Sequence, residues 1–211
     1  MKRTKLAFLA IIAVIFFAAF RETSYAQLRQ IKLRVDGLAC PFCAYGLEKN
    51  LKALKGVKEL KIDLDKGVVT LFPKEGALIP VDRLSEAVKD SGFTPRDIKL
   101  TVAGHITTLA KLKENQETAK AVAEIQKVAK ARGVKLPDNP FVLKLEKPNQ
   151  VFLLLKNPDK AYQKSFEQLS SIINNRQTIV VTGTLPVLKT KKSKILSMTL
   201  FVESFNMEKS G

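Results

Sequence analysis

The spacing of apolar residues between positions 29 and 104 constrains the fold of this chain more than any other feature. Residues 29–37 alternate apolar and charged side chains, which predicts a strand with one buried face. From Pro41 to Gly56 the apolar residues recur at helical spacing, which predicts an amphipathic helix. Its expected buried face consists of Phe42, Leu47, Leu51 and Leu54.

Four further elements follow, each bounded by glycine or proline. Residues 57–65 and 68–73 read as two strands joined by a tight turn at Lys66 and Gly67. A second helix is predicted over 80–92, followed by a strand from 93. The apolar face of this helix comprises Val81, Leu84, Ala87 and Val88. The order predicts a ferredoxin-like βαββαβ domain, with both helices on one face of a four-stranded antiparallel sheet.

The two cysteines of the chain, Cys40 and Cys43, fall between the first strand and the first helix. Soft ions such as Cu(I) and Hg(II) prefer thiolate ligands, and this spacing lets one loop supply both sulfurs. Cys43 is expected in the first helical turn, where free N–H groups should lower its pKa. A structural zinc site needs four ligands. The single histidine, His105, lies far downstream and is predicted to be a surface residue rather than a ligand.

The segments "GLACPFC", "LKALKGVKELKIDLDKGVVTL" and "SGF" resemble the heavy-metal-associated domain family. That family includes mercuric-ion periplasmic carriers, copper chaperones and the N-terminal modules of metal-pumping ATPases. The resemblance implies that Cys40 and Cys43 bind Cu(I) or Hg(II), with Zn(II) or Cd(II) as further candidates. It also implies a metal transporter or another metal carrier as the partner, and no enzymatic activity. Phe93 aligns with a position that abuts the metal loop, and a plain core role for Phe93 is the alternative.

Two positions of this loop differ from the usual family pattern. Leu38 stands where the family commonly has methionine, and Ala39 stands where the family often has threonine. Leucine can fill the volume of a packed methionine, so Leu38 is expected in the core.

A redox function is the first alternative, because "CPFC" also resembles the motif of glutaredoxins and other thiol–disulfide oxidoreductases. Those folds pair parallel strands through a helix and place a cis-proline opposite the motif. The predicted turn at Lys66 and Gly67 favours antiparallel strands instead. An adaptor or structural module is the second alternative.

The remaining sequence, 100–211, predicts a second unit built differently. A long helix is expected over 110–132, a hairpin over 141–155, a helix opened by Pro158 and Asp159, and two final strands over 178–188 and 195–205. The list resembles a small OB-like β-barrel with helical insertions. Nucleic acid is not expected as a partner, because tryptophan is absent and the phenylalanines lie in apolar runs.

The N-terminal segment has the three parts of a signal peptide: a basic start, an apolar run over 6–20 and small residues at Ser24 and Ala26. Cleavage after Ala26 is predicted, with a retained membrane anchor as the alternative. The protein is therefore expected in the periplasm or otherwise exported. The predicted division is 1–26 signal peptide, 27–99 heavy-metal-associated domain and 100–211 OB-like domain.

Positive charge is concentrated in the second unit. Residues 27–98 carry 13 basic and 10 acidic residues, whereas 99–211 carry 19 and 9. An anionic membrane surface is a candidate partner for this basic half, and the run "KTKKSK" over 189–194 is a candidate phosphate or lipid site. A lysine-rich surface that only contacts solvent is the other interpretation.

Overall fold

The protein is described by a computed structural model. It describes residues 27–77, 79–114, 118–119, 122–123, 125–127, 136–145, 150–173, 177–185 and 199–208. In these ranges no helix combines the length and apolarity needed to cross a membrane. The predicted signal peptide over 1–26 and the basic run over 189–194 lie outside the described residues.

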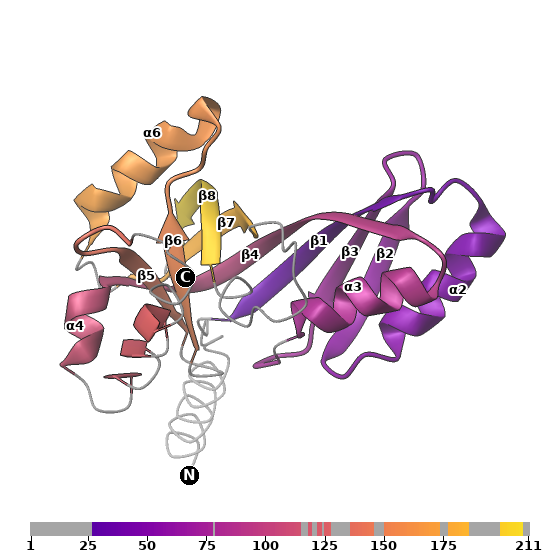
Figure 1. Ribbon diagram of the computed structural model, residues 1–211, viewed down its shortest axis with the longest axis horizontal. Helices are drawn as coiled ribbons and strands as arrows, with labels where there is room; N and C mark the ends of the chain where they lie inside the picture. The colour runs from indigo at the N-terminus through magenta and orange to yellow at the C-terminus, as the bar shows by residue number, and fades with distance from the viewer. Residues whose placement is uncertain are drawn as a thin grey trace, which may run out of the picture.

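The first half of the chain forms the predicted ferredoxin-like arrangement. Its elements are β1 (Leu28–Asp36), α2 (Pro41–Lys52), β2 (Val57–Asp63), β3 (Val68–Pro73), α3 (Val81–Asp90) and β4 (Thr94–Thr108). The strands pair antiparallel in the order β2-β3-β1-β4. Helices α2 and α3 lie beside this sheet (Figure 1), and their apolar residues join its core. The βαββαβ prediction is confirmed.

The turn between β2 and β3 shows why a glycine follows Lys66. Gly67 has a φ of +59°, and a Cβ at this position would lie 2.9 Å from the Val35 carbonyl oxygen. That close approach lets the Val35 N–H donate a 2.8 Å hydrogen bond to the Gly67 carbonyl. The tight turn therefore holds the hairpin against the end of β1, next to the cysteine loop.

The two helices differ in how well their buried faces were predicted. In α3 the four predicted residues are all buried. In α2 the buried residues are Ala44, Leu47 and Leu51, and the prediction of Phe42 as a core residue is wrong. Phe42 precedes Leu47 by five positions, about 140° around the helix at 100° per residue, so both cannot face the sheet. The helix ends at Lys52, earlier than the predicted Gly56.

The second half closes into a five-stranded barrel that begins with β4 itself. The further elements are α4 (Leu109–Lys113), β5 (Phe141–Leu145), β6 (Gln150–Leu155), α6 (Lys160–Leu169), the short 3-10 turn η1 (Ser170–Ile172), β7 (Ile179–Thr184) and β8 (Thr199–Met207). The pairing runs β4-β5-β6-β8-β7 and returns to β4, with β6 and β8 parallel. The predicted hairpin strands and the helix opened by Pro158 and Asp159 are confirmed. The two predicted final strands are confirmed in their described parts, and residues 186–188 and 195–198 of these predictions lie outside the described residues. Of the long helix predicted over 110–132, the structure describes α4 and helical residues at 118–119, 122–123 and 125–127.

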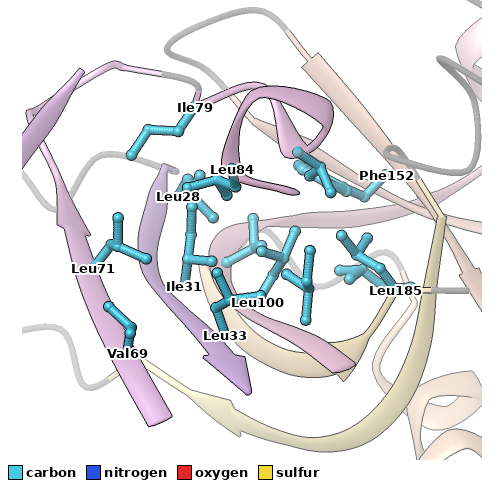
Figure 2. Packing of buried hydrophobic residues seen from close by; sticks show 14 of the residues in the cluster. Leu28, Ile31, Leu33, Val69, Leu71, Ile79, Leu84, Leu100, Phe152 and Leu185 are labelled. Carbon is cyan, nitrogen blue, oxygen red and sulfur yellow. The ribbon is translucent and has the colours of Figure 1, made fainter. Parts of the chain in front are cut away.

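Two hydrophobic clusters hold these elements together. The larger cluster is continuous from the first sheet into the barrel, and Figure 2 shows Leu28, Leu100, Phe152 and Leu185 gathered within it. The smaller cluster lies on the other face of β5 and β6. It joins Val142, Val151 and Leu153 of these strands to Leu109, Leu112, Val122 and Ile125 of the helical segment. That segment therefore covers the outer side of the β5–β6 pair.

Strand β4 belongs to both halves. Leu100 lies opposite Ile31 of β1 on one side and opposite Gly183 of β7 on the other. An ion pair between Arg29 and Glu208 links β1 to the residue that follows β8. The Ala103 N–H also donates a 2.8 Å hydrogen bond to the Gln27 carbonyl. The division of the chain after residue 99 stays a prediction, and the strand runs through that position without a break.

Helix α6 gives a direct test of a local stabilising contact. The Asp159 carboxylate accepts a 2.9 Å hydrogen bond from the Ala161 N–H, as an N-cap. We expect Asp159→Ala to lower the free energy of unfolding by about 1 kcal/mol, measured by urea denaturation. Asp159→Asn keeps the acceptor and should stay close to the wild type. Equal losses in both variants would contradict the capping role.

Candidate metal-binding thiol site

The cysteine loop is positioned by one glycine and one buried leucine. Strand β1 ends at Asp36, and Gly37 turns the chain with a φ of +86°. Leu38 is buried in the main core, as predicted, whereas Ala39 is exposed. The Ala39 N–H donates a 3.0 Å hydrogen bond to the Gly37 carbonyl. The loop is therefore anchored at its start and open to solvent where the thiols follow.

Both thiols lie at the beginning of α2. Cys40 is the N-cap residue and half-buried, Pro41 occupies the first helical position, and Cys43 is exposed in the first turn. Neither cysteine forms a disulfide. Proline at this position costs no hydrogen bond, because the first N–H groups of a helix have no acceptor within the helix. The backbone N–H groups of Phe42 and Cys43 lie near the Cys40 sulfur.

The two thiols differ in acidity, and the difference is opposite to the sequence-based prediction. The backbone N–H of Cys43, then the Cys43 thiol and the Phe42 N–H, favour the charged form of Cys40 and lower its pKa. The sulfur makes no regular capping hydrogen bond, so these groups act on it as nearby dipoles. The pKa of Cys43 is raised, first because its thiol donates to Cys40 and then by partial desolvation and the Cys40 charge. Cys40, and not Cys43, is the thiol that ionises first.

This order predicts the pH dependence of thiol modification. A lowered pKa means that the Cys40 thiolate forms at lower pH, so Cys40 should react with iodoacetamide at a pH where Cys43 is still protonated. Brief labelling of the reduced protein across a pH series, followed by peptide mass spectrometry, measures both profiles. In urea the two profiles should converge. Labelling of Cys43 before Cys40 in the folded protein would contradict the assignment.

The Phe93 ring lies beside Gly37 of the loop, although the two residues are far apart in the sequence. A Cβ built on Gly37 would lie 3.7 Å from Phe93 Cδ1, which is van der Waals contact. The Phe93 N–H donates to the Val88 carbonyl, and the ring packs half-buried against the main core. Phe93 therefore lies both against the loop and in the core, as each of the two interpretations required. A 2.5 Å ion pair between Arg96 and Asp36 braces the base of the same loop.

His105 is not brought to the thiols. It lies in β4 opposite Lys144 of β5, within the barrel part of that strand. Within the part of the chain that the structure describes, no three His, Cys, Asp or Glu side chains are grouped so as to hold an ion. An ion at this loop would therefore have two cysteine sulfurs as its ligands from the described residues.

Sequence reasoning missed the exposed aromatic residues beside the thiols. Phe42 is 91% exposed and Tyr45 is 71% exposed. The helical spacing of Ala44, Leu47 and Leu51 was the signal that could have placed both rings outside, because these three define a complete inner face.

A ferredoxin-like domain whose first strand leads into a loop with two free thiols, one half-buried and one exposed, has the features of a heavy-metal-binding domain. The chain belongs to the heavy-metal-associated domain family, whose domain matches residues 32–94.

The relatives of this segment include proteins of different length. The copper chaperone CopZ of Staphylococcus haemolyticus is 33% identical over 61 residues, which cover 29% of this chain and 88% of the chaperone. Human copper-transporting ATPase 2 is 36% identical over 70 residues, which cover 32% of this chain and 5% of the ATPase. A solved CopZ metallochaperone has 25% identity and a TM-score of 0.30, covering 32% of this chain and 98% of that chain. The family match lies in the first half of the chain, and the relatives named here each cover about a third of the chain.

Proposed function

We propose that this protein is an exported metal carrier that binds one soft metal ion, Cu(I), through Cys40 and Cys43, and is not an enzyme. The observation that carries the proposal is the pair of free thiols on one exposed loop at a helix N-terminus. The pKa of Cys40 is lowered, so one ligand is prepared to bind as the thiolate. The membership of this segment in a heavy-metal-associated family supports the same role.

Cu(I) is the preferred cargo because its chemistry fits two sulfur ligands and because the relatives named above are copper proteins. Hg(II) has the same preference for thiolates and is the second choice. Zn(II) and Cd(II) commonly take four ligands, which the described residues do not group at this loop. A metal transporter or another carrier is the proposed recipient.

We place the protein in the periplasm or another exported compartment, with residues 1–26 removed after Ala26. In that compartment the two thiols can also form a disulfide, so the carrier would have to be reduced before it binds its ion. Cell fractionation, with the N-terminus of the mature protein read by mass spectrometry, tests this placement.

We further propose that residues 100–211 form an OB-like barrel that binds a partner or fixes the position of the protein. The closed order β4-β5-β6-β8-β7, the parallel β6–β8 pair and the position of α6 between β6 and β7 support this assignment. Such barrels bind oligonucleotides on the face of their second and third strands, here β5 and β6. The cluster of Leu109, Leu112, Val122 and Ile125 covers that face, which supports a role other than nucleic-acid binding.

The excess of basic residues in this half makes an anionic membrane its proposed contact. Sedimentation with phosphatidylglycerol vesicles at rising salt tests the contact on the mature protein. Binding at low salt that weakens as salt rises is expected, and the absence of binding at low salt would contradict it.

Metal titration of the reduced mature protein tests the central proposal. We expect about one tightly bound Cu(I) per chain in competition with bathocuproine disulfonate. Binding no stronger than that of the protein with both cysteines alkylated would contradict it. Repeating the titration with Hg(II), Zn(II) and Cd(II) ranks the possible cargoes.

A thiol–disulfide oxidoreductase is the second candidate function. The unequal thiols favour it, because a Cys40 thiolate could attack a disulfide and Cys43 could then resolve the mixed disulfide. Insulin reduction with a dithiol reductant tests this candidate. Turnover that requires both cysteines, without tight Cu(I) binding, would replace the carrier proposal.

A further inference from the structure

Two aromatic side chains beside the thiols are left exposed by the fold. In the described residues, Phe42, Tyr45 and Met207 are the large apolar side chains that are exposed. Phe42 lies between Cys40 and Cys43 in the chain, and Tyr45 follows Cys43 by two positions. Met207 lies at the end of β8 in the barrel. The exposed aromatic surface of the described protein is therefore concentrated at the thiol site.

The exposed side of α2 changes character along its length. Phe42, Tyr45 and Lys49 are spaced by three and four residues, which places them on one side of the helix. All three are exposed. The first turn of α2 has no acidic residue, and its last turn has Lys49 and Lys52. Lys52 forms an ion pair with Glu48, so Lys49 supplies most of the positive charge of this side. We call Phe42, Tyr45 and Lys49 the α2 patch.

The size of the α2 patch fits a short-lived complex. A fully buried aromatic side chain contributes about 150–250 Å², so two of them provide roughly 300–500 Å². A stable protein interface needs about 800 Å² from each partner. The patch is therefore too small to hold a second copy of this chain permanently, and it is large enough to anchor a transient encounter.

Metal transfer requires such an encounter at this position. An acceptor must bring its own sulfur within bonding distance of the ion held by Cys40 and Cys43. Phe42 lies in the chain between the two ligands and is 91% exposed, so its ring is accessible to an acceptor that approaches the ion. An acceptor surface that was polar at this point would be desolvated against the ring without a hydrogen-bond partner.

We propose that Phe42 and Tyr45 form the hydrophobic anchor on which a metal-accepting protein domain docks. The acceptor has a pair of thiols beside an apolar recess, with carboxylate side chains on the side that meets Lys49. This inference rests on the carrier function proposed above. It adds the surface and the chemical character of the partner.

The transfer step is a ligand exchange without redox chemistry. The Cu–S bonds to Cys40 and Cys43 break as Cu–S bonds to the acceptor form, and copper stays Cu(I). The protons lost by the acceptor thiols are taken up by the emptied thiolates or by the buffer. The anchor raises the rate of this exchange by holding the two pairs of sulfurs together.

Two acceptors separate docking from metal affinity. The protein acceptor is the domain of human copper-transporting ATPase 2 that matches this chain, and the small acceptor is bathocuproine disulfonate. In the mature protein, the double variant Phe42→Ala/Tyr45→Ala should transfer Cu(I) to the ATPase domain about tenfold more slowly than the wild type. Transfer to the chelator should change less than twofold, because the chelator needs no docking surface. Met207→Ala is the matched control and should leave both rates unchanged.

Each other result counts against the anchor. An equal slowing with both acceptors would mean that the aromatic residues act on the metal site itself. An unchanged rate to the ATPase domain, or wild-type transfer to that domain no faster than to the chelator, would overturn the proposal. Binding of phosphatidylglycerol vesicles that depends on Phe42 would assign the patch to a membrane instead. If the wild type binds no Cu(I), the carrier function fails, and this is seen before any transfer is measured.

Discussion

Replacement of Cys40 by serine should weaken Cu(I) binding by at least about a hundredfold, since even the loss of a residue that only supports a metal ligand costs 10- to 100-fold. A serine hydroxyl is a poor ligand for a soft ion at neutral pH, and the remaining sulfur can supply one bond only. Cys43→Ser should have an effect of the same size, because both sulfurs are ligands. Competition with bathocuproine disulfonate measures the two affinities.

The two thiols differ in pKa, so the dependence of Cu(I) affinity on pH gives a further test. As the pH falls, protons compete with Cu(I) for both sulfurs. The raised pKa of Cys43 makes its sulfur the first to be protonated. Affinity in the wild type should therefore decrease as the pH falls through the range in which Cys43 titrates. Full binding by either single variant would show that the ion is not held between the two thiols.

Shortening a buried side chain of β4, the strand shared by both halves, should destabilise the whole molecule. Leu100 is 2% exposed and lies between β1 and β7 in the continuous core. We expect Leu100→Ala to lower the free energy of unfolding by about 2–5 kcal/mol, the usual loss for a buried leucine. Both halves should unfold in one transition, at lower urea concentration than in the wild type.

Met207→Ala is again the control, because an exposed side chain at a strand end should contribute within about 0.5 kcal/mol. Unfolding can be followed separately in each half, by hydrogen exchange of β3 amides and of β5 amides. Loss of protection in the barrel alone would show that the two halves are independent, in spite of the strand they share.

The first half of the fold could be predicted because local signals and global topology agree there. Each element from β1 to β4 has its own period and its own glycine or proline at the boundary. The face of α2 was mispredicted because Phe42 was assigned to the core by its apolarity. An exposed aromatic residue breaks the rule that apolar side chains are buried, and such exceptions occur at interaction sites.

The thiol chemistry could be predicted only in part. The spacing of Cys40 and Cys43 identified the loop and its helix N-terminus. It did not identify which sulfur receives the N–H groups, because that depends on Cys40 being the N-cap residue. Closure of the barrel could not be predicted from the sequence either. It depends on β4 pairing with three other strands, and one sequence pattern cannot encode a register to several partners.

The long β4 strand has a mechanical consequence for any partner. It begins beside the thiol loop and ends inside the barrel, and the two regions lie at opposite ends of the molecule (Figure 1). Strand β4 first pairs with the barrel strand β7 at Lys99. At about 3.3 Å per residue, the five steps from Thr94 to Lys99 separate the thiol end of β4 from the barrel by roughly 17 Å. A flexible linker would let the loop search many orientations, whereas a paired strand fixes its distance and direction. A membrane or protein that binds the barrel therefore also fixes the orientation of the thiols. No flexible linker has to be ordered for this, so its entropy cost is avoided.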